Sequence, residues 1–406
     1  MKITGIVAEY NPFHNGHLYQ IEYAKNNLNS DFVIVVMSGN FSQRGTPCIS
    51  DKFTRSKMAL SCGADMIVEL PAPLATASAE RFCEGAISIL NKLNCVDVVC
   101  FGSENTNLEL MNNIAQLLIN EPPSYSNLIK HNLKEGKSYP LARELAIIDH
   151  TPNYLHENIN LDNFLRQPNI ILGIEYIKAL IKFRSNIKPF PIKRQVSNYH
   201  DTEVFHHFAS ATALRQAFLQ QDNEALQQAM PQQSLNYLQN QIYFANIENI
   251  NSTLHYKLLQ EDNNNLWDTP PKLLHTIYNS FGQCSSFLEL VNKCSSKTYS
   301  KATVYRTLLR ILLNVTSDNM EILQQNDWIP YIRILGCKKE ALPLISKIKQ
   351  TSSVPIVINL KKDLSTLCPI GKILLNYDIK STQLYHLCTN QTHLYKQDFT
   401  ERFIIL

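Results

Sequence analysis

The first hundred residues alternate between short apolar runs and longer stretches with helical spacing of apolar positions. Runs rich in β-branched residues predict buried strands, and apolar residues three and four positions apart predict helices between them. The predicted strands are residues 3–8, 31–37, 65–70 and 96–101, and the predicted helices are residues 17–27, 52–62 and 75–90. Continuously apolar strands separated by helices are typical of a parallel sheet covered on both faces. We therefore expect an α/β fold.

Beyond residue 108 the spacing of apolar positions stays helical for a long stretch. Helical spacing continues over about 108–183, and a fifth apolar run at 190–196 predicts a further strand. A helical segment between two strands of one sheet is an insertion into that sheet. We therefore expect a Rossmann-like parallel-sheet domain over residues 1–216, with a helical insertion at about 108–183.

The second half of the chain is dominated by helical spacing and closes with shorter apolar runs. Residues 217–352 predict a mainly helical domain. The runs at 354–360 and 379–387 predict strands. We therefore expect a small α/β or β element over residues 353–406, after the helical domain.

Composition narrows the class of protein. The 406 residues are 44% hydrophobic and 18% charged, as in a globular protein with a core, and no apolar run reaches the length of a membrane span. The N-terminus lacks the apolar segment of a signal peptide, so we expect a cytoplasmic protein without a membrane span. The ten cysteines include no Cys-x-x-Cys pair, which favours reduced thiols over a disulfide framework or a zinc site.

The net charge of +3 is small, but the charge is unevenly distributed. Residues 286–350 hold 10 Lys or Arg against 5 Asp or Glu. A basic segment of this kind indicates a polyanionic partner.

A Pro-containing turn and a His-Asn-Gly-His unit follow the first predicted strand. His14 and His17 stand where this turn enters the first predicted helix, and Gly16 lets the backbone approach a ligand closely. Free N–H groups at a helix start attract phosphate, and ligands bind at the carboxyl ends of parallel strands. The turn therefore predicts a triphosphate site. The alternatives are two polar residues at a helix cap, or a metal site, for which no third ligand stands nearby.

Ser210, Thr212 and Arg215 form a second candidate phosphate site, at the start of a predicted helix. The two hydroxyls can cap the helix and donate to phosphate, and the guanidinium can hold phosphate with a fork of N–H donors. The alternative is an ordinary helix cap beside a solvated arginine.

In this order, the two motifs resemble those of the nucleotidyltransferase superfamily. In that superfamily a strand, His-x-Gly-His and a helix are followed by a Ser/Thr-rich phosphate loop ending in arginine; here Ala211 stands where that loop usually has a second serine. Further blocks narrow the resemblance to the bacterial tRNA(Met) cytidine acetate ligase family, because they occur in order over nearly the whole chain. The blocks are residues 9–17, 37–45, 101–104, 167–169, 194 with 199–201, and 331–336.

The resemblance implies a two-step ligase reaction. Acetate and ATP, the latter carrying Mg²⁺, would give acetyl-adenylate and pyrophosphate. The acetyl group would then pass to N4 of the wobble cytidine (C34) of elongator tRNA(Met), forming N4-acetylcytidine. The resemblance also implies that His14 and His17 are catalytic and stabilise charge on the triphosphate. The loop of Ser210, Thr212 and Arg215 would bind the β- and γ-phosphates.

The resemblance further implies a set of ATP-binding residues. They are Val7, Ala8, Glu9, Tyr10, Asn11, Pro12, Phe13, His14, Asn15, Gly16, His17, Leu18, Tyr19, Gln20, Gly102, Asn169, Arg194 and Gln195. The chain departs from the family pattern at Ile170, where an asparagine is usual, and at Gln195, where an apolar residue is usual.

We expect the tRNA to bind the basic part of the second half. The candidate residues are Lys297, Lys301, Arg306, Arg310, Arg333, Lys338 and Lys339. Lys52 and Arg55 are expected on a solvated helix face, and the alternative is that they contact phosphates or tRNA. Asp65 and Glu69 flank a buried strand and are expected to be structural rather than catalytic.

Two other functions compete with a tRNA ligase. One is a small-molecule adenylyltransferase that makes a cofactor, and the other is a non-catalytic RNA-binding protein with a relic nucleotide fold. The long helical second half argues against the first alternative. The intact His14, His17 and Arg215 argue against the second.

Overall fold

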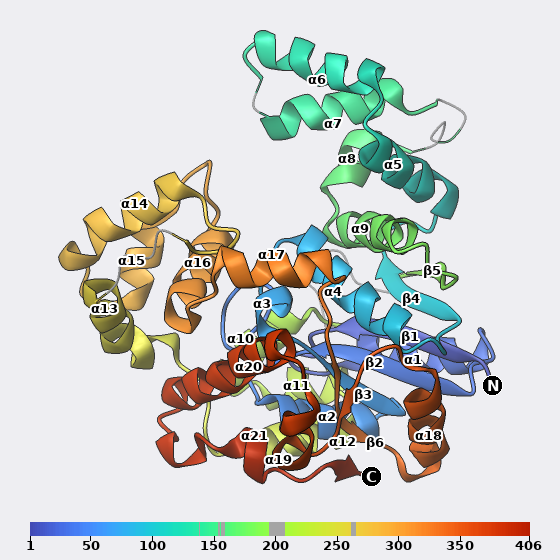
Figure 1. Ribbon diagram of the computed structural model, residues 1–406, viewed down its shortest axis with the longest axis vertical. Helices are drawn as coiled ribbons and strands as arrows, with labels where there is room; N and C mark the ends of the chain where they lie inside the picture. The colour runs from blue at the N-terminus through green and yellow to red at the C-terminus, as the bar shows by residue number, and fades with distance from the viewer. Residues whose placement is uncertain (138, 153–154, 156–158, 195–207, 261–264) are drawn as a thin grey trace.

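The computed structural model describes residues 1–137, 139–152, 155, 159–194, 208–260 and 265–406. Within them lies an eight-stranded sheet of order β5-β4-β1-β2-β3-β6-β7, with β8 paired to β6 (Figure 1). The first five strands are parallel, and β6 runs antiparallel to β3. The strands are β1 Ile3–Ala8, β2 Phe32–Ser38, β3 Met66–Leu70, β4 Val98–Ser103, β5 Lys188–Lys193, β6 Ile332–Cys337, β7 Ile356–Val357 and β8 Ile404–Ile405. The predicted parallel α/β sheet is confirmed.

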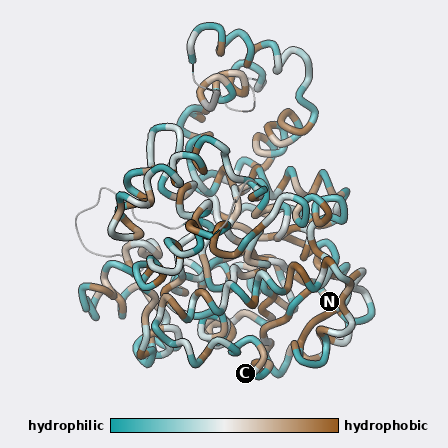
Figure 2. Tube along the Cα trace, turned by 60° about the vertical axis from the view of Figure 1, so that its left-hand side comes forward, coloured by the Kyte–Doolittle hydropathy of each residue, from teal (hydrophilic) through white to brown (hydrophobic). Residues whose placement is uncertain are grey.

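Both faces of the sheet are buried. Alternate side chains of β2 enter two different hydrophobic clusters, so that Ile34 lies on one face and Val35 on the other. The face of Val35 is covered by α1 (Asn15–Asn26), α2 (Lys52–Ser61) and α12 (Gln232–Gln239), and we call it the α1 face. The face of Ile34, covered by α4 (Ala79–Lys92) and α9 (Pro168–Lys182), we call the α9 face. Burial on both faces explains why the strands are continuously apolar, and Figure 2 shows hydrophobic positions gathered in them.

A group of helices lies between β4 and β5. It consists of α5 Leu108–Asn120, α6 Pro123–Lys134, α7 Tyr139–His150, α8 Leu161–Arg166 and α9. The pair α6 and α7 projects from the top of the molecule in Figure 1, whereas α9 packs against α4 and α5. The insertion thus places one helix, α9, directly beside the sheet.

The expected helical region begins on the α1 face and continues into a separate group of helices. Its first helices are α10 Ala211–Leu219, α11 Asn223–Ala229 and α12. The next are α13 Asn251–Gln260, α14 Pro271–Ser280, α15 Phe287–Cys294, α16 Lys301–Leu313 and α17 Ser317–Gln325. In Figure 1, α13 to α16 form a lobe on the left of the sheet.

The C-terminal region differs from the prediction in two ways. Residues 379–387 are not a strand but part of the helix α20 (Pro369–Cys388), which buries Asp378, Ser381 and Thr382 on its inner side. These polar residues interrupt the apolar stripe and hide its helical period. In addition, β6 falls inside the segment expected to be helical, and β6, β7 and β8 extend the N-terminal sheet. The end of the chain is therefore joined to the first domain.

Two smaller predictions are adjusted. The single helix expected at 75–90 is divided into α3 (Ala72–Ala75) and α4. The fifth strand begins earlier than expected, at Lys188. No helix among the described residues has both the length and the hydropathy that crossing a membrane requires.

Candidate active site

A cavity of about 240 Å³ opens at the carboxyl ends of the central strands. Val7 and Ala8 from β1, Phe101 and Gly102 from β4, and Ile192 from β5 contribute to its wall. The chain passes from β1 to β2 and β3 on one side, and places β4 and β5 on the other. Such a change of direction is the usual position of a ligand crevice in an open α/β sheet.

His14 and His17 form a reciprocal cap at the start of α1. The backbone N–H of Gly16 donates to Nδ1 of His14 at 3.1 Å, and the backbone N–H of His14 donates to Nδ1 of His17 at 3.2 Å. The two rings stack with 3.7 Å between their centroids. Because each Nδ1 accepts a hydrogen bond, each neutral ring carries its proton on Nε2. Both histidines therefore offer an N–H donor from the ring edge opposite the helix backbone.

The histidines are held in the neutral form. Burial lowers the pKa of His14 to about 3, and the positive charge of Arg194 acts in the same direction. Burial also lowers the pKa of His17 well below its ordinary value, with His14 and Arg194 adding to the effect. At neutral pH the pair acts through hydrogen bonds rather than through a formal positive charge.

The second phosphate motif meets the first. Arg215 on α10 donates from Nη1 to the carbonyl of Asn11 at 2.7 Å, and from Nη2 to Oγ1 of Thr212 at 3.1 Å. The Ser210 hydroxyl caps α10 by accepting from the N–H of Ala213. The start of α10 is therefore fixed beside the turn that carries the histidines.

Three of the predicted nucleotide contacts form one connected group. Arg194 donates from Nη1 to Oδ1 of Asn169 at 2.9 Å, and Nδ2 of Asn169 donates to Glu104 at 2.6 Å. A Cβ on Gly102 would lie 3.2 Å from Cγ of Arg194, so the missing side chain leaves room for the arginine to cross the end of β4. Asn169, Arg194 and Gly102 all line the cavity.

The cavity includes most of the residues expected to bind ATP. Those that line it are Val7, Ala8, Glu9, Tyr10, Asn11, His14, Gly16, His17, Tyr19, Gln20, Gly102, Asn169 and Arg194. Phe13 and Leu18 pack in the hydrophobic cluster of the α1 face, and Asn15 donates to the carbonyl of Gln228. Pro12 follows a cis peptide bond in the turn. Gln195, with the block 199–201, lies outside the described residues.

The sequence did not single out one wall of the cavity. The wall contains Phe82 of α4 and Leu172 and Tyr176 of α9, together with Gln43 from the loop after β2. Phe82, Leu172 and Tyr176 have the spacing of ordinary core residues, which gives no functional signal. Gln43 lies within a block that carried the family resemblance, and that block was the available signal.

Comparison with known proteins places this geometry in a family. A family model described as HIGH Nucleotidyl Transferase matches residues 1–400. The tRNA(Met) cytidine acetate ligase of Acetivibrio thermocellus is 37% identical over 419 residues, covering 100% of both chains, and that of Clostridium perfringens is 39% identical over 390 residues, covering 95% of both. The chain belongs to the tRNA(Met) cytidine acetate ligase family. The predicted resemblance is confirmed.

Solved structures agree with this membership. Thermotoga maritima TmcAL in its apo form superposes with a TM-score of 0.90 at 30% identity, covering 100% of both chains. The structure of that protein bound with alpha-thio ATP superposes with a TM-score of 0.89.

In this family member, Arg55 is part of the site's support and not a solvated residue as expected. The side chain is fully buried. It donates to the carbonyl of Glu9 at 2.5 Å, to that of Ser38 at 3.1 Å, and to that of Gly39. Arg55 thus joins the ends of β1 and β2, where the cavity opens.

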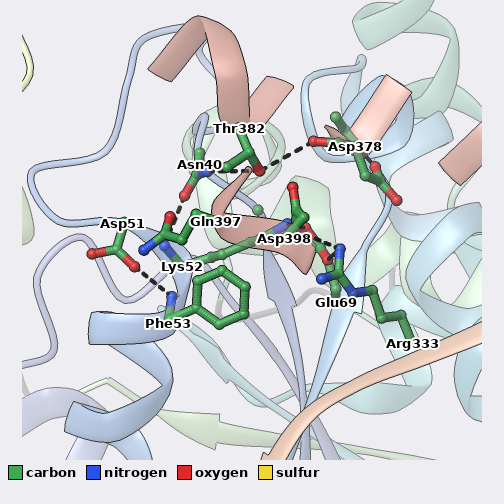
Figure 3. A network of polar contacts seen from close by, with 12 residues as sticks. Asn40, Asp51, Lys52, Phe53, Glu69, Arg333, Asp378, Thr382, Gln397 and Asp398 are labelled. Carbon is green, nitrogen blue, oxygen red and sulfur yellow. Dashed lines mark hydrogen bonds and ion pairs between the residues drawn. The ribbon is translucent and has the colours of Figure 1, made fainter. Parts of the chain in front are cut away.

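Lys52 and Arg333 also differ from the prediction, because both belong to a buried ionic cluster. Lys52 pairs with Glu69 and with Asp398, each at 2.7 Å. Arg333 pairs with the same two carboxylates, at 3.0 Å and 2.8 Å. Figure 3 shows the four side chains converging, with Asp398 contributed by α21 (Gln397–Thr400). Arg333 is therefore not available to a tRNA, and the structural role expected of Glu69 is this pairing.

Arg310 is likewise unavailable to a tRNA. It is 3% exposed, pairs with Asp268 at 2.7 Å, and lies over the ring of Trp267. Burial lowers the pKa of Arg310 to about 10, and Asp268 opposes that effect. Arg310 was expected to bind tRNA, but α16 turns its side chain into the core.

The other tRNA candidates lie at two ends of the sheet. Lys297 and Lys301 are exposed, and Arg306 is partly buried on α16. The backbone N–H of Lys338 donates to the carbonyl of Asp65, which precedes β3. Lys338 and Lys339 therefore lie at the amino ends of the parallel strands, whereas the cavity opens at their carboxyl ends. The structure therefore does not bring the seven candidates together.

The described residues offer no group of three or more His, Cys, Asp or Glu side chains that could hold a metal ion. Of those lining the cavity, Glu9 is the single carboxylate, and its Oε1 accepts from the N–H of Gln43 at 2.7 Å.

Proposed function

We propose that this chain activates acetate with ATP and transfers the acetyl group to N4 of the wobble cytidine of elongator tRNA(Met). The observation that carries the proposal is the bond between Arg215 and Asn11, which fixes the second phosphate motif beside the first, whose His14 and His17 line the cavity. The chain carries this arrangement while matching tRNA(Met) cytidine acetate ligases over nearly their whole length.

The first step is a displacement at the α-phosphorus of ATP. A carboxylate oxygen of acetate forms a bond to that phosphorus, the bond to the bridging oxygen breaks, and pyrophosphate leaves. Negative charge increases on the bridging and non-bridging oxygens as the bond breaks. Positioned donors are therefore the main requirement for catalysis.

The chain supplies these donors from two helix starts. The Nε2–H groups of His14 and His17 are directed to the α-phosphate region, and the first turn of α1 adds the positive end of the helix dipole. Arg215 and the hydroxyls of Ser210 and Thr212 hold the departing β- and γ-phosphates. Removing one such donor costs about 10²–10³ in rate.

The second step needs no covalent enzyme intermediate. The adenylate is a mixed anhydride, so the cytidine amine attacks the acetyl carbonyl carbon directly. The bond from that carbon to the AMP oxygen breaks, AMP leaves, and N4 loses one proton. The chain's task in this step is to bring the base and the adenylate together.

Mg²⁺ fits this site as a companion of ATP. A single lining carboxylate, Glu9, cannot form a protein cage, and Mg²⁺ ordinarily keeps several waters and binds substrate phosphates. The ion would neutralise charge on the triphosphate.

For the tRNA, we propose a surface that consists of Lys297, Lys301 and Arg306. A Cβ on Gly45 would lie 2.7 Å from the backbone nitrogen of Arg306, so α16 lies against the loop that carries Gln43 into the cavity. A tRNA bound there would have its single-stranded anticodon loop near the cavity mouth. Because tRNA is a cytoplasmic molecule in bacteria, we assign the enzyme to the cytoplasm.

The test combines two assays on the full chain. Labelled acetate, ATP and separately purified tRNAs should give label in elongator tRNA(Met) and none in initiator tRNA. Pyrophosphate release should depend on acetate. His17→Ala should abolish both signals while tRNA binding persists, because His17 contacts the nucleotide and not the RNA.

Other outcomes would favour the competing functions. Pyrophosphate release that ignores acetate but depends on a small-molecule phosphate acceptor would indicate an adenylyltransferase. Binding of tRNA with no pyrophosphate release under any condition would indicate a non-catalytic RNA-binding protein.

A further inference from the structure

The cavity has a second wall that faces the histidines. Phe82 of α4, Phe101 of β4, and Leu172 and Tyr176 of α9 line it, and all four pack with the hydrophobic cluster of the α9 face. His14 and His17 stand at the start of α1, which covers the opposite face of the sheet. The site is therefore polar on one side and apolar on the other.

The apolar wall is tightly packed from behind. A Cβ on Gly173 would lie 2.7 Å from Cε2 of Phe101, so the helix backbone of α9 touches that ring. The rings of Phe101 and Tyr176 have centroids 5.5 Å apart. Sγ of Cys83 donates to the carbonyl of Leu172 at 3.7 Å, which fixes α9 against α4. The wall cannot move back without disturbing these contacts.

The direction of attack brings the acyl group to this wall. Attacking and leaving oxygens are roughly in line in a displacement at phosphorus. The leaving pyrophosphate is assigned to the start of α10, whose Leu214 and Ala217 pack in the cluster of the α1 face. The carboxylate must then approach from the α9 face. Its alkyl end would then point toward Phe82, Leu172 and Tyr176, which line the cavity on that side.

We propose that Phe82, Leu172 and Tyr176 set the length of the acyl chain that this enzyme accepts. This inference rests on the proposed function. The methyl group of acetate fits against the wall, whereas propionate adds a methylene that the packed side chains do not admit. Formate leaves the apolar surface unfilled. One methylene in a hydrophobic pocket corresponds to a discrimination of about 10–200-fold.

The test is a change of acid preference in the full chain. Leu172→Ala should raise the ratio of kcat/KM for propionate to kcat/KM for acetate at least about tenfold, measured as pyrophosphate release with saturating ATP and tRNA. Ile171→Ala is the matched control. Ile171 precedes Leu172 on the same helix but is 40% exposed and lies outside the cavity lining, so the ratio should stay unchanged. Phe82→Leu, on a different helix, should change the ratio in the same direction.

The same measurements contain the outcomes that overturn the inference. An unchanged ratio in both wall variants would overturn it. An unchanged ratio together with a raised KM for ATP would also overturn it, because the wall would then contact the adenine. An unchanged ratio together with a raised KM for tRNA would overturn it too, because the wall would then contact the cytidine. If the wild-type chain releases no pyrophosphate in response to acetate, the proposed function itself is wrong, whatever the wall does.

Discussion

Arg215 donates to the carbonyl of Asn11 at 2.7 Å although the two residues are 204 positions apart in the sequence. The bond fixes the start of α10 against the turn before α1. Neither helix start alone could surround a triphosphate, so the proposed phosphate site requires the two distant segments to be packed together.

Arg215→Lys should show what the planar guanidinium contributes. The lysine keeps the positive charge but cannot donate to Asn11 and to phosphate through a fixed fork. We expect kcat/KM for ATP to fall about 10²–10³-fold in the pyrophosphate assay. Gln216→Lys, on an exposed neighbouring position of α10, should retain full activity. An Arg215→Lys variant as active as the wild type would remove Arg215 from the phosphate site.

Lys52→Met should destabilise the protein strongly. It leaves Glu69 and Asp398 buried with Arg333 as their remaining cation, and breaking a buried pair costs about 3–5 kcal/mol. Lys57→Met on the same helix removes a partly exposed pair with Glu401 and should cost about 0–1 kcal/mol. Urea unfolding of both variants measures the difference. Equal losses would show that the cluster adds nothing beyond a surface pair.

Acid should destabilise the ATP-free chain partly through His14. The folded-state pKa is about 3, whereas an unfolded imidazole has a pKa of about 6.5. Between these values the unfolded chain binds more protons, so the free energy of unfolding falls as the pH drops from about 6.5 toward 3. His14→Asn retains a helix cap but lacks the titrating ring.

The measurement for His14 is urea unfolding at pH 7 and pH 5. The loss between these pH values should be smaller in His14→Asn than in the wild type, by about 1–2 kcal/mol. His17 should contribute in the same direction, because burial lowers its pKa too. Parallel losses in wild type and variant would contradict a buried neutral His14.

The double variant Lys301→Gln, Arg306→Gln should weaken tRNA binding and reduce its salt dependence. Each lost phosphate contact lowers the slope of log affinity against log salt by about 0.7–0.9. Lys339→Gln, at the end of the sheet opposite the cavity, should leave tRNA binding unchanged. Filter binding of elongator tRNA(Met) at several salt concentrations measures both. If Lys339→Gln weakened tRNA binding more than the double variant did, the RNA would bind at the end of the sheet opposite the cavity.

The sequence alone predicted the parts whose signal is local. Strands such as β1 are apolar throughout because both sheet faces are covered, and the His14–His17 turn is contiguous. The main error of the sequence-based prediction was the exposure of four Lys and Arg side chains. Lys52, Arg55, Arg310 and Arg333 look solvated in sequence because a charge is ordinarily exposed. Their partners are backbone carbonyls or carboxylates brought near only by the folded chain.

The wrong prediction at α20 and the missed apolar wall have one cause, which is that hydropathy does not show what surrounds a side chain in the fold. The buried side of α20 contains polar residues that bond across the core, such as Thr382 with Asn40 and Asp378 with Tyr331. A hydropathy pattern cannot distinguish them from surface residues. Leu172 gave the opposite problem, because an apolar residue that lines a cavity has the same spacing as one that fills a core.

The four residues of the buried ionic cluster are synthesised at two different times during translation. The ribosome makes Lys52 and Glu69 early, as a neutral pair, and makes Arg333 and Asp398 only near the end of translation, as a second neutral pair. Until then β3 has no neighbour on its outer side, since β6 is not yet made. A nascent chain therefore carries the turn of His14 and His17 together with an open strand edge, which is a template for unwanted pairing between chains. The last segment to leave the ribosome covers that edge and brings the second ion pair.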